Sequence, residues 1–438
     1  MLRNNINMVV RETKREIGEK LASELGIPLL TARLLAARGF TDAAEAKHFL
    51  FADEDQVYDP FLLDGMGKAV QRIRRAMESR EKVWVYGDYD ADGVSSTALM
   101  IRLFERLAAN FDYYIPNRNK EGYGLNMQAL ETAQKAGVTL IVTVDTGISA
   151  VAEIDYAARL GIEVIVTDHH EPPDVLPDAY ALINPKKPGD RYPFKQLAGV
   201  GVALKLAQAL LETVPDTYYE LAAIGTVADL MPLLNENRLI VKKGIKAMRT
   251  DCSPGIRALL AIAGIHPANI TSLQIAYALS PRINAGGRMD SAIPAVKLLT
   301  ADNEQTAEQF ARELDRLNRY RQETVEAITE EALAQLKETE ISTQHVLIVA
   351  SDGWNVGVVG IVAAKIAEKY HKPAIVLVMD AAAGLAKGSA RSVAGFDIVH
   401  ALARCGELLD HYGGHQAAAG LTIRLENLGL FKAEINHI

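Results

Sequence analysis

The chain contains little cysteine: Cys252 and Cys405 are the only two among its 438 residues. This scarcity excludes a disulfide-stabilised scaffold and a zinc site built from several thiolates. No run of sequence approaches the ~18 apolar residues that a membrane-spanning helix needs. The first residues also lack the apolar core of a secretion signal. We therefore expect a cytoplasmic protein with no membrane partner.

Net charge is also small, because 47 basic and 55 acidic residues leave −8 at pH 7. A surface that is basic throughout is therefore excluded. A local basic groove is not, since anion binding depends on where charge lies and not on its sum. Hydrophobic residues make up 49% of the chain and charged residues 23%, which is typical of globular proteins. The length is enough for two or three hydrophobic cores, and we find no internal repeat or low-complexity tract.

The first two thirds of the chain change character near residues 60 and 235. Residues 1–60 carry leucines at helical spacing and predict a helical cap on the next domain, with a separate binding module as the alternative. Residues 61–235 alternate helical stretches with short β-rich runs, which are Val83–Tyr86, Thr139–Val144, Glu163–Thr167 and Ala181–Asn184. This alternation predicts βαβ units and a parallel sheet, so ligands should bind after the strands, at their carboxyl ends.

The last third of the chain combines one long helix with a second α/β pattern. Residues 303–338 have a narrow apolar stripe and many charges, which favours a connector between two domains; a coiled-coil dimer is the alternative. Strand-like runs follow at Val346–Ala350, Ala374–Val378 and Ala419–Ile423. Glycine-rich turns are expected at Gly384–Gly388 and Gly413–Gly414. We therefore predict two α/β domains joined by a long helix.

Three carboxylates at alternate positions, Asp88, Asp90 and Asp92, follow the first β-rich run directly. Like charges this close repel, so either a cation lies between them or their pKa values rise. Aspartate-rich turns also begin many helices, and EF-hand loops read Asp-x-Asp. The EF-hand is excluded because an apolar strand precedes the motif and no glutamate stands at loop position 12.

Three further groups fall at comparable places in the predicted sheet. Asp145 ends the second run, His169 and His170 end the third, and Asp229 ends an apolar run. A single aspartate there is usually a helix cap, and a single histidine is usually structural. Parallel pairing, however, brings such strand ends to one edge. Hard carboxylate oxygens with imidazole and no thiolate suit Mn²⁺ or Mg²⁺. The number of ligands favours two ions, which would activate water and stabilise a phosphoryl displacement.

These motifs resemble those of the DHH phosphoesterase superfamily: Asp88-Tyr-Asp-Ala-Asp92, Asp145-Thr-Gly147, Asp168-His-His170 and Asp229. Within it, the chain is similar to the RecJ family. The supporting motifs are Tyr58–Phe61, Ile115–Arg118, Glu121–Leu125, Asn184–Lys186, Leu197–Gly201, Pro281–Asn284, Gly286–Arg288, Gly353–Gly357, Lys387–Arg391 and Gly413–Gln416. The resemblance implies a DHH catalytic domain over 61–300, a connector helix over 301–340 and a smaller α/β DHHA1 domain over 341–438.

The resemblance also implies roles for individual residues. Asp90, Asp92, Asp145, His169 and Asp229 match metal-ligand positions, and Asp88 matches a further acidic position of the same site. His170 matches a histidine near the scissile phosphate. A pocket for a 5′-terminal phosphate would include Arg118, Ser389 and Arg391, and Arg282 and Arg288 would contact backbone phosphates.

The chemistry of Ser389-Ala-Arg391 suits a phosphate, because a hydroxyl, backbone N–H groups and a guanidinium lie together in a glycine-flanked loop. Gly413-Gly414 beside His415 would allow the backbone to approach a ligand closely. The alternative for Ser389 and Arg391 is a plain turn with a surface arginine. For Arg282 and Arg288 it is a structural salt bridge to Asp290 or to glutamates.

The resemblance implies a metal-dependent 5′→3′ exonuclease that degrades single-stranded DNA to 5′-mononucleotides in DNA repair and recombination. A RecQ-type helicase and a single-strand-binding protein are the expected partners. Members of this family usually continue into an OB fold, which we expect to be missing here, with weaker DNA affinity as the result. The alternatives are a DHH phosphodiesterase for short RNA or cyclic dinucleotides, and a catalytically inactive relative that only binds DNA.

Overall fold

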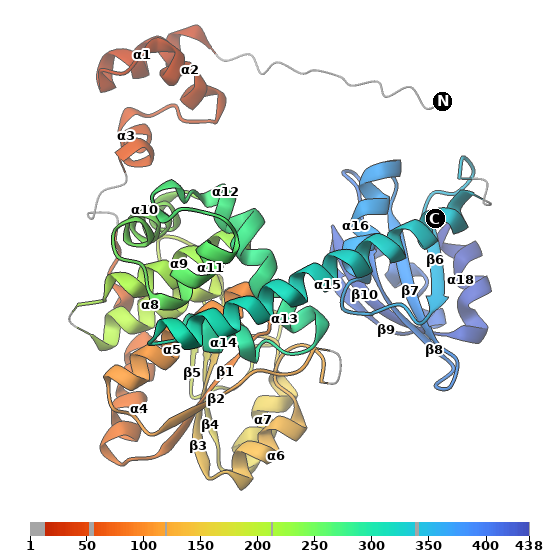
Figure 1. Ribbon diagram of the computed structural model, residues 1–438, viewed down its shortest axis with the longest axis horizontal. Coiled ribbons are helices and arrows are strands. Elements are labelled where there is room, and N and C mark those ends of the chain that lie inside the picture. Colours follow the sequence, from red (N-terminus) through yellow and green to blue (C-terminus); the bar gives the residue numbers. More distant parts are fainter. Residues whose placement is uncertain (1–13, 52–56, 119–120, 212, 338–340, 438) are drawn as a thin grey trace.

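The computed structural model describes residues 14–51, 57–118, 121–211, 213–337 and 341–437 (Figure 1). Its first sheet contains five parallel strands in the order β2-β1-β3-β4-β5. Their bounds are β1 Lys82–Gly87, β2 Phe111–Tyr114, β3 Val138–Val144, β4 Glu163–Thr167 and β5 Ala181–Ile183. The predicted parallel sheet is thereby confirmed, and β2 is a strand that the sequence pattern missed.

Helices cover both faces of this sheet, which explains why its central strands are apolar throughout. On one face Val83 and Val85 of β1 share a core with α4 Met66–Glu78, α5 Ala91–Arg106 and α8 Gly199–Leu210. On the other face Trp84 and Tyr86 share a second core with α6 Met127–Lys135 and α7 Val151–Arg159. Alternate side chains of one strand thus serve two cores.

A helical layer extends the first of these cores. It contains α9 Asp216–Ala228, α10 Asn235–Thr250, α11 Pro254–Ile262, α12 Ser272–Gln274, the π-helix η4 Ile275–Leu279, α13 Ser280–Met289 and α14 Ile293–Leu299. Short 3₁₀ turns, η2 Pro60–Leu62 and η3 Pro267–Asn269, complete this lobe. The sheet and this layer together form the larger lobe of the molecule (Figure 1).

The long helix α15, Glu304–Lys337, runs from the larger lobe to the smaller one (Figure 1). With ~1.5 Å of rise per residue it is about 50 Å long. Its N-terminal half contributes Ala311 and Leu314 to the core of the larger lobe. Its C-terminal half contributes Ile328 and Leu336 to a core of the smaller lobe. The helix therefore connects the lobes as predicted, but as a packed part of both and not as a solvated strut.

The smaller lobe contains a mixed sheet in the order β6-β7-β8-β10-β9. Only β6 Leu347–Asp352 and β7 Ala374–Asp380 pair in parallel; β8 Leu385–Arg391, β10 Ala418–Arg424 and β9 Leu409–His415 pair antiparallel. Helix α16 Val359–Tyr370 covers one face, while α17 Ile398–Arg404 and α18 Leu428–Ile435 share the core on the other. Two short 3₁₀ turns, η5 Gly406–Leu408 and η6 Leu425–Asn427, join these elements.

The two predicted glycine-rich turns had different outcomes. The turn is confirmed at Gly384, which has φ +68° and ends the connection between β7 and β8, but residues 385–388 belong to β8. The turn predicted at Gly413–Gly414 was wrong, because both residues lie in β9. The residue at position 388 of β8 is a glycine because a Cβ there would come within 2.1 Å of the Val376 carbonyl oxygen on β7. The glycine therefore allows close strand packing instead of a chain reversal.

Three N-terminal helices pack on one another: α1 Arg15–Leu25, α2 Leu29–Ala37 and α3 Ala43–Phe51. They have a small core of their own, and they meet the larger lobe where Arg238 of α10 lies 3.9 Å over the ring of Phe49. Residues 1–13 of the predicted helical region lie outside the described residues. None of the described helices is long and apolar enough to cross a membrane.

Candidate active site

The carboxyl edge of the first sheet gathers polar side chains from three adjacent strands. Asp88 directly follows β1, Asp145 directly follows β3, and His169 and His170 follow β4. Asp145 adopts a left-handed backbone conformation, φ +60°, and its N–H donates to the Thr167 carbonyl at the end of β4. Left-handed backbone is unusual for a residue with a side chain and concentrates at functional sites.

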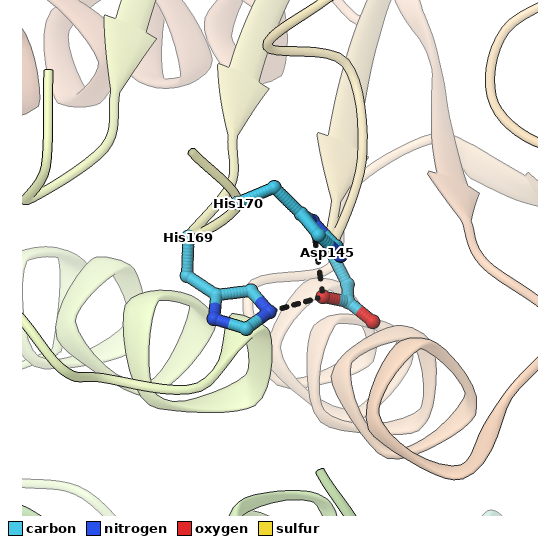
Figure 2. Close-up of side chains that lie close together, drawn as sticks. All are labelled: Asp145, His169 and His170. Atoms are coloured by element: carbon cyan, nitrogen blue, oxygen red, sulfur yellow. Dashed lines mark ion pairs between the residues drawn. The ribbon is translucent and has the colours of Figure 1, made fainter. Parts of the chain in front are cut away.

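Three carboxylates lie close to His169. Its Nε2 lies 3.1 Å from Asp145 Oδ1, 3.6 Å from Asp229 Oδ2 and 3.9 Å from Asp92 Oδ2. His170 Nδ1 lies 4.0 Å from the same Asp145 oxygen, so Asp145 stands between the two imidazoles (Figure 2). Three overlapping groups of ligand atoms each lie within 4.8 Å: Asp145/His169/His170, Asp92/His169/Asp229 and Asp88/Asp90/Asp145. All seven predicted residues are therefore brought together.

Asp229 reaches the cluster from an element that the sequence analysis did not foresee. The apolar run before it is helix α9 and not a strand, and Asp229 is the C-cap of that helix. The run looked strand-like because it is buried throughout, and periodicity does not distinguish a buried strand from a buried helix.

Two aspartates of the first motif also organise the backbone around the site. Asp90 Oδ1 accepts hydrogen bonds from the N–H groups of Asp92 and Gly93, which caps α5. Asp92 accepts from Gly199 N–H at 2.7 Å and Val200 N–H at 2.9 Å, at the start of α8. Because a carboxylate offers about four acceptor sites, these bonds leave lone pairs for a cation.

Several buried ligand atoms in the cluster have no hydrogen-bond partner. They are one oxygen each of Asp88 and Asp145, and both ring nitrogens of His169. His169 Nε2 and Asp145 Oδ1 form no hydrogen bond although they are 3.1 Å apart. Buried polar atoms are normally satisfied, so orphaned lone pairs that face one another fit a bound cation.

The electrostatics of the cluster agree with this interpretation. Burial, and then the charges of neighbouring aspartates, raise the pKa values of Asp88, Asp92 and Asp145 well above the ordinary range. Burial also lowers the pKa of His169 to about 3, so its imidazole is neutral and able to bind a metal. In the described parts of the chain, no lysine or arginine forms an ion pair with Asp88, Asp92 or Asp145.

Asp168, which stands in the Asp-His-His motif, plays a different part from its neighbours. Its Oδ1 accepts from the N–H groups of His169 and His170 and contacts His170 Nδ1 at 2.7 Å, and its Oδ2 accepts from Ile148 N–H. Burial lowers the pKa of His170, but the hydrogen bond and charge of Asp168 outweigh burial and raise that pKa to about 9. Asp168 thus positions a cationic His170.

Glycines make room for the carboxylates, which the sequence analysis did not anticipate. A Cβ on Gly199 would lie 2.4 Å from Asp145 Oδ1, and one on Gly225 would lie 2.5 Å from Asp92 Oδ1. Both glycines belong to helices that face the sheet edge. A glycine inside an apolar helical pattern was the signal that could have revealed this contact.

A pocket of about 400 Å³ lies beside the cluster, between the two lobes. The larger lobe contributes Tyr89, Arg118 and Tyr123 to its walls, and the smaller lobe contributes Ser389 and Arg391. The Arg391 Nη1 group donates to Ser389 Oγ at 3.0 Å, and both side chains lie on β8 and not in the loop that we expected. No acidic residue is among the lining residues of this pocket.

Further arginines lie near the two that line the pocket, and Arg288 feels the charges of both Arg118 and Arg391. Burial, and then the charges of Arg118 and Arg321, lower the pKa of Arg288 to about 10. Arg288 donates to the Gly357 carbonyl oxygen, and no carboxylate pairs with it in the described structure. Arg321 on α15 was missed because a lone arginine in a charged helix carries no sequence signal. Uncompensated arginines at one place fit a phosphate.

Two predicted substrate contacts lie elsewhere. Arg282 is held in a structural ion pair, with Nε 3.0 Å from Asp315 Oδ1 and Nη1 donating to the Ala278 carbonyl. The alternative of a structural salt bridge is therefore the one that the structure shows for Arg282. Its acidic partner, however, is Asp315 of α15, whereas we expected Asp290 or a glutamate. His415 is exposed at the end of the edge strand β9 and does not line the pocket.

Comparison with known proteins assigns the two lobes of the chain to known domain families. Residues 82–226 match the model of the DHH family, N-terminal domain, and residues 343–438 match the DHHA1 domain. The single-stranded-DNA-specific exonuclease RecJ of Bacillus subtilis is 45% identical over the whole chain, which spans 56% of that protein. RecJ of Escherichia coli is 37% identical over 97% of this chain and 77% of its own length.

Solved structures agree with this assignment. RecJ of Thermus thermophilus in complex with Mn²⁺ superposes with a TM-score of 0.84 at 30% identity, over 97% of this chain and 61% of that one. A second exonuclease RecJ bound to manganese gives a TM-score of 0.75 at 33% identity, over 86% of this chain and 94% of that one. The predicted fold is confirmed: an α/β DHH domain and a smaller α/β DHHA1 domain joined by a long helix. The chain spans little more than half of its Bacillus relative, and it belongs to the RecJ family of DHH phosphoesterases.

Proposed function

We propose that this chain is a metal-dependent 5′→3′ exonuclease, which degrades single-stranded DNA to 5′-mononucleotides in repair and recombination. One observation supports this more than any other: a single residue links the metal cluster to the cationic pocket. Tyr123 lines the pocket, and its hydroxyl oxygen lies 3.4 Å from His170 Nδ1. A phosphate at the pocket and a phosphodiester at the cluster would thus belong to adjoining parts of one strand.

In this proposal Asp90, Asp92, Asp145, His169 and Asp229 hold two Mn²⁺ or Mg²⁺ ions, with Asp88 completing the site. The donors are hard oxygens and neutral imidazole, which suit these metals. When bound, the ions would supply an activated water and Lewis-acid stabilisation for an in-line displacement. The relatives solved with Mn²⁺, and with Mg²⁺ for the Thermus protein, support the choice of metal.

The side chains around the metal cluster would bind and position the DNA strand. His170, kept cationic by Asp168, would donate a hydrogen bond to the scissile phosphate. Arg118, Ser389 and Arg391 would hold the 5′-terminal phosphate, and Arg288 would neutralise the strand beside it. Contacts of Arg282 and His415 with the DNA backbone remain part of the proposal, although Arg282 would have to share its guanidinium with Asp315.

We also propose the domain limits stated above: a helical cap over 1–60, a catalytic domain over 61–300, a connector over 301–340 and a substrate-binding domain over 341–438. Because the proposed substrate is DNA, the proposed location is the cytoplasm. A RecQ-type helicase would supply single strands, and a single-strand-binding protein would present them.

A product assay tests this function. The protein, with Mn²⁺, is given equal-length oligonucleotides with a 5′ phosphate and a 3′ label: single-stranded DNA, blunt duplex DNA and single-stranded RNA. We expect 5′-mononucleotides to be released stepwise from the 5′ end of single-stranded DNA alone. The same assay includes a dinucleotide of RNA and a cyclic dinucleotide, and cleavage confined to these two would instead assign the chain to another DHH phosphodiesterase activity. Binding without turnover in any metal would contradict an enzymatic role.

A further inference from the structure

The end of helix α9 has an unusual residue in a well-known turn. Leu230 N–H donates to the Val227 carbonyl and Met231 N–H donates to the Thr226 carbonyl, each at 3.2 Å. This pair of bonds closes a helix through one residue in left-handed conformation, a place that glycine usually takes. Here the residue is Leu230, with φ +56°.

A leucine at this position raises the conformational free energy of the folded chain. A side chain destabilises left-handed backbone, because its Cβ crowds the neighbouring carbonyl. Packing in the chain does not offset this cost, because Leu230 is 84% exposed, the highest value among the exposed large hydrophobic residues of the described structure. Strained residues are often found at functional sites, so an exposed leucine in this conformation calls for a contact outside the chain's own packing.

The position of Leu230 suggests what that contact is. Its neighbour Asp229 places Oδ2 3.6 Å from His169 Nε2, inside the candidate metal cluster. Leu230 directly follows a residue whose side chain faces into the cluster and is itself about a third exposed to solvent. A strand that enters the cluster from solution could therefore cover the apolar side chain of Leu230.

We infer that Leu230 packs against a base of the single-stranded substrate, next to the phosphodiester held at the metal cluster. This inference rests on the proposed function and adds a substrate contact to it. A strand with its phosphate at the cluster presents apolar surface chiefly through the faces of its bases. In a duplex those faces are stacked and covered, so the contact favours a single strand.

The test uses Leu230→Gly with a matched control, Ala108→Gly. Ala108 ends helix α5 in the same turn, with φ +52° and the bonds Ala108 N–H to Glu105 O and Ala109 N–H to Phe104 O. It lies at the far end of α5, about 24 Å from the end that carries the aspartates. Thermal unfolding and kcat/KM are measured for wild type and both variants on 5′-phosphorylated single-stranded DNA in Mn²⁺.

We expect both glycine variants to unfold about 1–3 °C higher than wild type, because each removes a strained side chain. Ala108→Gly should keep wild-type kcat/KM, whereas Leu230→Gly should lose about tenfold through the missing apolar contact. A second series carries one abasic site at each of the first four nucleotides. At the position whose base Leu230 contacts, wild type and Leu230→Gly should become equal.

Three outcomes would overturn the inference. Unchanged kcat/KM in Leu230→Gly would show that the side chain does not contact substrate. A lower unfolding temperature would show that Leu230 stabilises the fold. An equal loss on every abasic strand would show a general defect instead of a base contact. Failure of wild type to cleave any strand would refute the proposed function itself, and the inference with it.

Discussion

Replacing Arg391 with alanine should reveal whether the pocket between the lobes holds a 5′ phosphate. The guanidinium is half-buried, and burial and the charge of Arg118 lower its pKa. Its hydrogen-bond partners are neutral: Ser389 Oγ at 3.0 Å and the Ala390 carbonyl at 2.8 Å. A partly desolvated cation without a carboxylate partner is available for a phosphate, and its removal leaves no protein charge unpaired.

The size of the effect follows from this environment. Truncating one partner of a buried, hydrogen-bonded charge pair costs about 2–5 kcal/mol. Because Arg118 also faces the pocket and the pocket opens to solvent, the lower end applies, about 2–3 kcal/mol. Binding of a 5′-phosphorylated strand should then weaken about 30- to 150-fold. A strand with a 5′ hydroxyl should be affected little, because it lacks the group that Arg391 contacts.

The assay compares KM and kcat on two strands that differ only at the 5′ end. Lys387→Ala is the matched control, since Lys387 lies on the same face of β8 but is exposed and does not line the pocket. Arg391→Ala should raise KM for the phosphorylated strand and leave the unfolding temperature nearly unchanged. An equal loss on both strands, or the same loss in Lys387→Ala, would refute a specific phosphate contact.

Three further predictions concern charge in the larger lobe. Asp145→Asn should abolish turnover and the rise in unfolding temperature on adding Mn²⁺. The metal-free variant should be more stable than metal-free wild type, because a buried carboxylate that its neighbours repel is lost. A metal-induced rise that persists would contradict the site. Burial raises the pKa of Glu220 to about 7 from an ordinary 4.5, so the stability that the protonated carboxyl gives below pH 4.5 is lost as pH rises through 7. Glu220→Gln should match wild type in urea unfolding at pH 4 and exceed it by up to about 3 kcal/mol at pH 8, and an equal difference at both pH values would refute this. Lys205→Met should cost about 3–5 kcal/mol in urea unfolding because it leaves Glu236, 2.9 Å away, buried and unpaired; adding Glu236→Gln should recover part of that cost, and full additivity would exclude the coupling.

The sequence predicted that these carboxylates and imidazoles lie close together, because their convergence depends on topology. Parallel strands end at one edge, so Asp88, Asp145 and His169 had to lie close together once the strands were recognised. The same argument failed for Asp229, which arrives on a helix from a distant part of the chain. Its approach depends on how α9 packs on α5 and α8, and no local pattern encodes that packing.

Other features required the packed structure. Gly388 and Gly414 looked like turn residues, but each allows another strand to approach too closely for a side chain. The partner of Arg282 is 33 residues away on α15, and only the packing of α13 against that helix brings Asp315 within reach. Long-range contacts of this kind leave no signature in spacing or composition.

The roles of Asp168 and Leu230 could not be predicted from the sequence either. Asp168 belongs to a recognisable motif, yet only its hydrogen bonds show that it positions His170. Leu230 reads as one apolar residue among several. Its backbone angle and exposure together set it apart, and neither is visible in the sequence.

The proposed function requires this cluster of carboxylates and imidazoles to hold two metal ions side by side. Titrating the metal-free protein with Mn²⁺ and recording electron paramagnetic resonance spectra tests it directly. Two ions about 3.5–4 Å apart should bind per chain and give an exchange-coupled spectrum, and Asp145→Asn should lose that coupling. One ion per chain at saturation, with the six-line spectrum of isolated Mn²⁺, would contradict the account.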